Sequence, residues 1–266
     1  MAFGATKKVD ESVSDRPLGD LFKPVTELMP DRALKIGVWG KAKVGKTHFC
    51  LTIPTGKIYV IDTEGSIKTN IQQFGPDVQA RVFVAEVLQF ADKEKRHINL
   101  VQSLDVLVDA IDKITSAIAD ESSGITIVID SATDMWDWLG IWIDEKPGTQ
   151  HIKGGDQVAR LEWGKANKRY AEMMYMLLHG KCNVIMTFRA KEAVGNDGAN
   201  LGYYVPRWQK NTDYWLDLIA QIDKVGNKRS MIFKGGRYGD TIPVLDNPSW
   251  PRLTDHLDKV CKVKFN

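Results

Sequence analysis

Eight residues near the start of the chain have the types and spacing of a phosphate-binding loop. They fit the pattern G-x-x-x-x-G-K-[ST] in full and are Gly40, Lys41, Ala42, Lys43, Val44, Gly45, Lys46 and Thr47. The glycines let backbone N–H groups curl around phosphate oxygens, and a helix continuing through His48 adds partial positive charge. We expect Lys46 to reach the β- and γ-phosphates and Thr47 to offer its hydroxyl to Mg²⁺. Residues 40–48 are therefore predicted to bind a nucleoside triphosphate.

A carboxylate for the metal is predicted at the end of a second apolar run. Residues 125–129 read Ile-Thr-Ile-Val-Ile and are followed by Asp130. A buried parallel strand that ends in an acid brings that acid to the carboxyl edge of the sheet, where phosphate loops also lie. Asp130 is therefore expected to bind Mg²⁺ directly or through a water.

A candidate for activating water lies after another strand. The strand candidate at residues 57–61, apolar after Lys57, leads into Asp62, Thr63 and Glu64. Hydrolysis needs a group that orients or deprotonates the attacking water, and Glu64 is the candidate. The alternatives are that Glu64 is a solvated loop acid and that Asp62 caps the following turn.

Strands and helices alternate along most of the chain, which predicts an α/β fold. Short β-branched runs predict strands at 34–39, 57–61, 81–84, 125–129 and 183–187, and apolar periodicity predicts helices at 104–119, 158–179 and 254–262. Residues 218–225 and 229–233 flank a Gly-Asn-Lys turn and predict a hairpin. The expected domain is a mostly parallel sheet flanked by helices, with an antiparallel C-terminal hairpin, over residues 33–266. Residues 1–32 are expected to be a flexible arm.

Composition limits the other possibilities. With 36 basic and 34 acidic residues, the chain has no overall charge that would mark a nucleic-acid or membrane-surface protein, so any basic patch must be local. The cysteines are far apart and lack metal-ligand spacing; they are Cys50, Cys182 and Cys261. No apolar run is long enough to cross a membrane. We expect a cytoplasmic protein with no membrane partner.

These motifs together resemble the core of RecA-like P-loop ATPases. "IDTE" after the second strand and "IVIDSAT" on a later strand carry the resemblance, together with the phosphate loop. It implies ATP and Mg²⁺ as cofactors and Glu64 as the water-activating acid. The size is most similar to small phage-encoded proteins linked to single-strand annealing, which would place the chain in a host cytoplasm.

The resemblance also implies that three cationic side chains contact the nucleotide's phosphates. Where the family has a polar sensor of the γ-phosphate, this chain has Phe188-Arg189, and Arg189 is chemically suited to that contact. Lys234 and Arg237 resemble a basic motif that such proteins project into a neighbour's nucleotide site. Each of the three could instead be a solvated surface cation. Self-association into an oligomer or filament is implied, although no clear Phe-x-x-Ala polymerisation motif is present.

Lys41 permits a different interpretation. Dimeric partition-type ATPases carry a signature lysine just after the first loop glycine, which crosses to the partner's nucleotide. Those loops continue with small glycines. Here Ala42 and Lys43 follow, and the bulk of Lys43 argues against tight packing in trans. The simpler alternative is that Lys41 and Lys43 raise the local positive potential near phosphate.

Two loops are expected to face single-stranded DNA, by the same resemblance. They are residues 145–157 and 189–204, both rich in glycine and polar residues and expected to be mobile. Tyr203, Tyr204, Arg207 and Trp208 could stack on bases. Trp136, Trp138 and Trp142 are expected in the core or at a subunit interface.

The leading hypothesis is an ATPase acting on single-stranded DNA in recombination or annealing, with a single-strand-binding or replication protein as a candidate partner. The alternatives are a partition-type or helicase-loading switch whose partner is a protein, and a nucleotide-binding module with negligible hydrolysis.

Overall fold

The computed structural model describes residue 22 and residues 33–92, 97–118, 124–152, 158–195, 197–237 and 244–261. The expected arm over residues 1–32 lies almost wholly outside the described residues. Its one described residue before Ala33 is Phe22, which is exposed.

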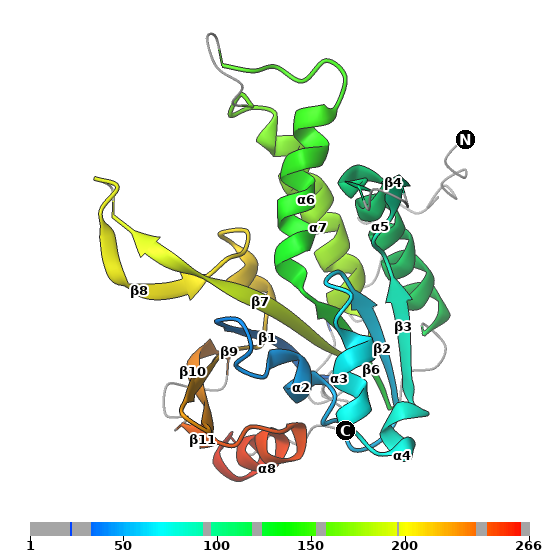
Figure 1. The fold of residues 1–266 in the computed structure, drawn as a ribbon, viewed down its shortest axis with the longest axis vertical. Helices are drawn as coiled ribbons and strands as arrows, with labels where there is room; N and C mark the ends of the chain where they lie inside the picture. Colours follow the sequence, from blue (N-terminus) through cyan, green and yellow to red (C-terminus); the bar gives the residue numbers. More distant parts are fainter. Residues whose placement is uncertain are drawn as a thin grey trace.

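The described elements alternate between strands and helices (Figure 1). The strands are β1 (Lys35–Gly40), β2 (Lys57–Asp62), β3 (Val82–Glu86), β4 (Phe90–Asp92), β5 (His97–Ile98), β6 (Ile125–Asp130), β7 (Asn183–Val194), β8 (Asn200–Pro206), β9 (Leu218–Val225), β10 (Lys228–Gly236) and β11 (Leu245–Asp246). The helices are α2 (Lys46–Cys50), α3 (Ile67–Asn70), η3 (Ile71–Gln73), α4 (Pro76–Gln79), α5 (Leu100–Ala117), α6 (Ala132–Glu145), α7 (Trp163–His179), η4 (Thr212–Trp215) and α8 (Trp250–Cys261).

The main sheet has the strand order β11-β10-β9-β1-β7-β6-β2-β3, and β8 pairs with β7 beside this path. The strands from β9 to β3 in this order are parallel to their neighbours, and β10 and β11 are antiparallel. The predicted fold class is confirmed. The C-terminal hairpin is also present, but its first strand, β9, continues the parallel sheet beside β1 instead of extending it antiparallel.

Helices cover both faces of the sheet, so its central strands are buried on both sides and mostly apolar. Helices α5, α6 and α7 lie on one face, and α2 and α8 lie on the other (Figure 1). All six residues of β1 and all six of β6 are buried, which explains why neither strand alternates between apolar and polar residues. The parallel register aligns the strand ends. Gly40 lies opposite Arg189, and Asp62 lies opposite Asp130.

Three helix starts differ from the sequence predictions. Helix α5 begins at Leu100, four residues earlier than predicted, where the side chain of Asn99 accepts a hydrogen bond from the backbone N–H of Gln102. Helix α7 begins at Trp163 rather than near residue 158, because Val158 forms a β-bridge with His151 and residues 160–162 form a turn. The C-terminal helix begins at Trp250, four residues earlier than predicted, because Pro251 fits the first turn of a helix.

Residues 189–204 are not a mobile loop, and that expectation is wrong. Strand β7 continues to Val194 and folds back as β8, giving an antiparallel hairpin that projects beyond the body of the sheet (yellow in Figure 1). The turn contains Asp197 and Gly198, whose φ of 81° suits glycine. Most of the hairpin's side chains are exposed, so the sequence has no apolar alternation to reveal the strands. None of the described helices is both long and apolar enough to span a membrane.

Gly56 and Gly124 lie against each other just before the neighbouring parallel strands β2 and β6. Gly56 has φ of 77°, and a Cβ added to it would lie 1.7 Å from the carbonyl oxygen of Gly124. We expect Gly56→Ala to lower the free energy of unfolding by about 2 kcal/mol or more, because both the backbone and the neighbour must shift. The matched control is Gly164→Ala, at an exposed position of α7 where nothing lies within 4 Å of an added Cβ. Its free energy of unfolding should change by no more than about 1 kcal/mol. Urea unfolding compares them; equal stability of the two variants would contradict this account.

Candidate nucleotide-binding site

The phosphate loop joins β1 to α2 and depends on two glycines. A Cβ on Gly40 would lie 2.4 Å from the carbonyl oxygen of Ile222, and Gly45 has φ of 107°. A larger residue at either position would displace the loop or strain its backbone. Lys43 also has a positive φ, of 62°, which shows how tightly the chain curls here. The predicted loop residues therefore form the curled backbone that phosphate binding requires.

Lys46 points back across the loop. Its Nζ donates to the carbonyl oxygens of Gly40, at 3.1 Å, and Lys41, at 2.9 Å. Burial lowers the pKa of Lys46, while the carboxylates of Asp130 and Glu64 act in the opposite direction. An ammonium group held beside the loop in this way is a suitable partner for the charge of a triphosphate.

Asp130 lies at the end of β6 with the loop threonine against it. Its Oδ2 accepts a hydrogen bond of 2.7 Å from Oγ1 of Thr47, and its Oδ1 accepts one from the hydroxyl of Thr187. Asp130 is only 1% exposed, and burial raises its pKa despite these two hydrogen bonds. The peptide bond between Asp130 and Ser131 is cis.

These donors fit magnesium. A hydroxyl oxygen and a carboxylate oxygen within hydrogen-bonding distance are hard ligands of the kind Mg²⁺ prefers. Within the described ranges, no three His, Cys, Asp or Glu side chains cluster as a metal cage. A magnesium ion held by Thr47 and Asp130 would therefore need phosphate oxygens and waters for its remaining ligands.

Asp62 positions the segment that carries Glu64. Its carboxylate accepts hydrogen bonds from the backbone N–H groups of Glu64 (3.1 Å), Gly65 (2.8 Å), Ser66 (3.3 Å) and Ile67 (3.0 Å). Asp62 thus caps the turn before α3, which was one of the alternatives left open by the sequence. The cap fixes the backbone of Glu64 at the same edge as Asp130.

Arg189 joins Glu64 to the start of α6. The Nε and Nη2 atoms of Arg189 lie 3.0 and 2.9 Å from Oε1 of Glu64, and Nη2 lies 2.8 Å from Oδ2 of Asp134. Oδ2 of Asp134 also accepts a 2.7 Å hydrogen bond from Thr63. Burial acts to lower the pKa of Arg189, but Asp134 and Glu64 outweigh it and the pKa is raised. Arg189 therefore lies in the site as predicted, but its guanidinium group is bonded to Glu64.

A pocket of about 670 Å³ unites most of the predicted residues. Those that line it are Ala42, Lys43, Gly45, Lys46, Thr47, His48, Glu64, Asp130 and Arg189. Gly40 and Val44 contribute to the loop's backbone from outside this lining. Lys41 instead turns outward, with its Nζ 4.0 Å from the centre of the Tyr204 ring on β8.

Several polar residues of the pocket were missed by sequence reasoning. Ser66, Asn70 and Gln73 lie on and beside α3, and Arg229 enters from β10. Arg229 Nε donates to the carbonyl oxygen of Val44 at 3.1 Å, and a Cβ on Gly45 would lie 3.0 Å from the same Nε. Arg229 is the second residue of β10 in the C-terminal hairpin, but only the pairing of β9 with β1 places it beside the loop.

Lys234 and Arg237 do not lie in this pocket. The end of β10 is level with the start of β9 and β1, which is the opposite edge of the sheet from the phosphate loop. Arg237 forms an ion pair of 3.3 Å with Asp217 there, and Lys234 is exposed. Neither cation can reach a nucleotide on its own chain, so a role in phosphate contact requires a second copy and stays a prediction.

Glu64 can be tested separately from nucleotide binding. Glu64→Gln keeps the shape and an oxygen for Arg189 but removes the basic carboxylate. We expect ATP affinity within about threefold of the original and turnover reduced about 10²- to 10⁴-fold. Glu86→Gln is the matched control, because Glu86 ends the neighbouring strand β3 opposite Asp62 but lies outside the pocket. Unchanged turnover in Glu64→Gln would remove Glu64 from the chemistry.

Comparisons with known proteins agree with this site. The family model described as "AAA domain" matches residues 32–241, which include every element from β1 to β10. No curated protein matches the chain. Among solved structures, the RadB recombinase is similar with a TM-score of 0.48 and 14% identity over 81% of this chain and 87% of its own.

Two secretion ATPases are also similar. An ATPase of the type III secretion system of pathogenic bacteria has a TM-score of 0.45 and 12% identity, over 72% of this chain and 51% of its own. EscN of enteropathogenic E. coli, in complex with its central stalk EscO, has a TM-score of 0.47 and 11% identity, over 72% of this chain and 42% of its own. Given the family match over most of its length and the phosphate loop at the edge of its parallel sheet, this chain belongs to the AAA-domain family of P-loop ATPases.

Proposed function

We propose that this protein hydrolyses ATP with Mg²⁺ and that single-stranded DNA bound at the β7–β8 hairpin controls the reaction, in recombination or annealing of the phage type. The observation that carries the proposal is the contact between Arg189 and Glu64. Arg189 is the residue at which β7 passes from the parallel sheet into the hairpin, since Gly40 lies opposite it and Ala190 already pairs with β8. A shift of the hairpin would therefore move the partner of the candidate water-activating group.

A second contact joins the hairpin to the phosphate loop. The ammonium group of Lys41 packs on the ring of Tyr204, and cation–π contacts of this kind contribute about 0.5–1 kcal/mol at exposed sites. Lys41 follows the first glycine of the phosphate loop, so a change in the loop's position on phosphate binding would be passed to β8 through this contact. This contact within one chain also gives Lys41 an alternative to the trans role found in partition-type ATPases.

The hairpin carries exposed rings and cations that suit unpaired bases, with Tyr203 and Lys191 on one face and Tyr204 on the other. Tyr203 and Tyr204 are 54% and 37% exposed, and Lys191 and Arg207 are exposed on the same hairpin or at its end. Rings and cations along a strand are the groups that bind single strands without sequence preference. Arg207 forms an ion pair of 2.9 Å with Asp137 on α6, which would hold it in position beside the strand.

A protein partner is the second candidate. Val194 and Leu201, near the turn of the hairpin, are 60% and 50% exposed. Apolar side chains at the tip of a projecting hairpin favour contact with another protein or a second copy of this chain. Contact of Lys234 and Arg237 with a nucleotide would also require a second copy, as the resemblance implies for an oligomer.

ATP turnover titrated with single-stranded DNA tests the proposed function. We expect DNA to accelerate turnover in the original protein, and Lys46→Ala to have no measurable turnover with or without it. Tyr204→Ala should need about tenfold more DNA for half-maximal stimulation, whereas Tyr204→Phe keeps the ring and should stay within a few fold. The solution mass with and without nucleotide, measured on the same samples, reports self-association. Turnover that responds only to a protein partner would favour the second candidate.

The role of Arg189 gives a separate prediction. If Arg189 restrains Glu64 until the hairpin moves, Arg189→Ala should raise turnover without DNA and abolish the response to DNA. Arg169→Ala is the matched control, because Arg169 forms its ion pair with Asp105 between helices α7 and α5, away from the nucleotide pocket. A fall in turnover that still depends on DNA would show instead that Arg189 acts on the γ-phosphate, as the sequence suggested.

A further inference from the structure

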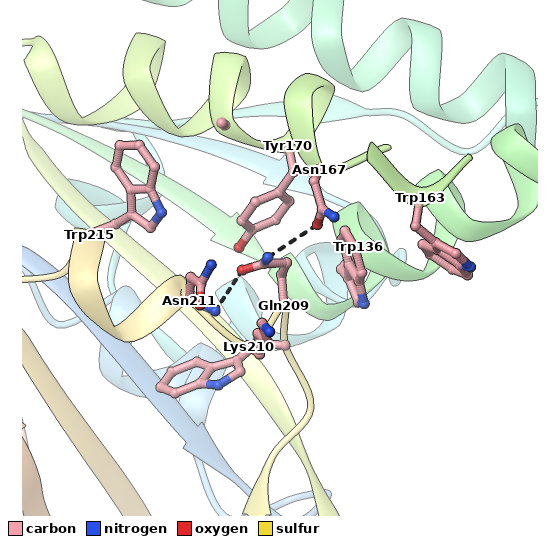
Figure 2. Close-up of a pocket in the computed structure, with 10 residues that line it drawn as sticks. Trp136, Trp163, Asn167, Tyr170, Gln209, Lys210, Asn211 and Trp215 are labelled. Carbon is pink, nitrogen blue, oxygen red and sulfur yellow. Dashed lines mark hydrogen bonds between the residues drawn. The ribbon is translucent and has the colours of Figure 1, made fainter. Parts of the chain in front are cut away.

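A second cavity lies away from the nucleotide pocket, on the helical face of the sheet. It has a volume of about 540 Å³ and is formed by α6, the first half of α7 and residues 208–215 (Figure 2). None of its lining residues is shared with the nucleotide pocket. We call it the aromatic pocket, because Trp136, Trp163, Tyr170, Trp208 and Trp215 form most of its wall.

The rings of the wall are held in place by one another. Trp136 lies 5.6 Å from Trp163 at an angle of 37°, and 5.6 Å from Tyr170 edge to face. The hydroxyl of Tyr170 is hydrogen-bonded to Thr212 at 2.8 Å. Tyr170 is buried, whereas the indoles are half-buried and expose part of their surface to the cavity. Rings fixed in this way can accept a flat ligand with little loss of side-chain entropy.

Amide groups accompany the rings. Gln209, which is 8% exposed, donates from Nε2 to Oδ1 of Asn167 at 3.1 Å and accepts from the backbone N–H of Asn211 at 2.6 Å (dashed in Figure 2). Within the described part of the chain, Nδ2 of Asn167 and the side-chain amide of Asn211 have no hydrogen-bond partner. Lys210 is exposed beside them and forms no ion pair with any described residue. The pocket therefore offers ring faces, amide donors and acceptors, and one cation.

We propose that the aromatic pocket takes up one base of a bound single strand of nucleic acid. The proposal rests on the proposed function, which brings the strand to the adjacent hairpin. A nucleobase is flat, presents donors and acceptors at its edge, and carries a phosphate next to it. These three features match the rings, the free amides and Lys210, respectively. Asn167 and Asn211 are exposed, so their amides stay within reach of a ligand that enters from solvent.

The pocket is also connected to both the hairpin and the nucleotide site. Its segment begins directly after β8, and the backbone carbonyl of Arg207 accepts a 2.9 Å hydrogen bond from Oγ1 of Thr133. That same Oγ1 accepts from the backbone N–H of Arg189 at 2.9 Å. Thr133 lies in the first turn of α6, three residues after Asp130 and three before Trp136. A base in the pocket would thus contact α6, the helix that carries Trp136. The first turn of the same helix contains Asp134, which forms the ion pair with Arg189.

Binding of a fluorescent single-stranded oligonucleotide tests the proposal, with an abasic oligonucleotide of the same length as the second probe. We expect Trp163→Ala to weaken binding of the intact strand about tenfold and to leave binding of the abasic strand unchanged, because only the intact strand has bases to stack. Asn211→Ala, at an exposed position, should weaken the intact strand about threefold or more without risk to folding. Tyr214→Ala is the matched control, since Tyr214 is an exposed ring beside the pocket that does not line it, and both strands should bind it as they bind the original protein.

The outcomes separate this proposal from the proposed function. Unaltered binding of the intact strand by Trp163→Ala and Asn211→Ala, with DNA-stimulated turnover retained, would overturn the base pocket and leave the function standing. Failure of the original protein to bind either strand would overturn both. A change in solution mass in Trp163→Ala without any change in DNA binding would identify the pocket as a contact between copies and overturn the base assignment.

Discussion

The hydrogen bonds that hold Asp130 between Thr47 and Thr187 are the interaction on which the rest of the nucleotide site depends. A carboxylate that is 1% exposed is costly to keep charged, and the raised pKa of Asp130 reflects that cost. Its two hydroxyl partners come from α2 and β7, so three separate elements are tied together at one atom pair. A bound magnesium ion would add positive charge beside this carboxylate. A buried acid of this kind is expected of a group kept for binding rather than for stability.

Arg189 gives the fold its second organising point. It stands where β7 leaves the covered sheet, and it contacts acids from two other elements, Glu64 and Asp134. A guanidinium group can hold both carboxylates because its donors are arranged in a rigid fork. The same residue therefore belongs to the nucleotide site by its side chain and to the hairpin by its backbone. On this double membership rests the proposal that hydrolysis is coupled to binding at the hairpin.

Helix α6 extends this connection toward the aromatic pocket. In its first turn, the hydroxyl of Thr133 is hydrogen-bonded to the backbone of both Arg189 and Arg207. The carboxylate of Asp134, the next residue, forms an ion pair with the guanidinium group of Arg189. One turn further, Trp136 and Asp137 contact the pocket and Arg207. Two sites on different faces of the molecule are in this way joined by a single rigid element. The helix can couple binding at the two sites only if it has two conformations or positions, and if ligands at both sites change the balance between them.

Sequence alone determined the local chemistry of this protein. The phosphate loop, Asp130 after its apolar strand and Glu64 after the preceding strand are contiguous or follow from strand ends, and the α/β class follows from alternating periodicity. Tertiary structure alone decided which distant residues meet them. Arg229 enters the pocket because β9 lies beside β1, Arg189 bonds to Glu64 because β7 lies next to β1 and β6, and the exposed ribbon of β7 and β8 has no buried face to mark it in the sequence. Long-range pairing is set by the packing of the whole sheet and its covering helices, and no local pattern of residues encodes it.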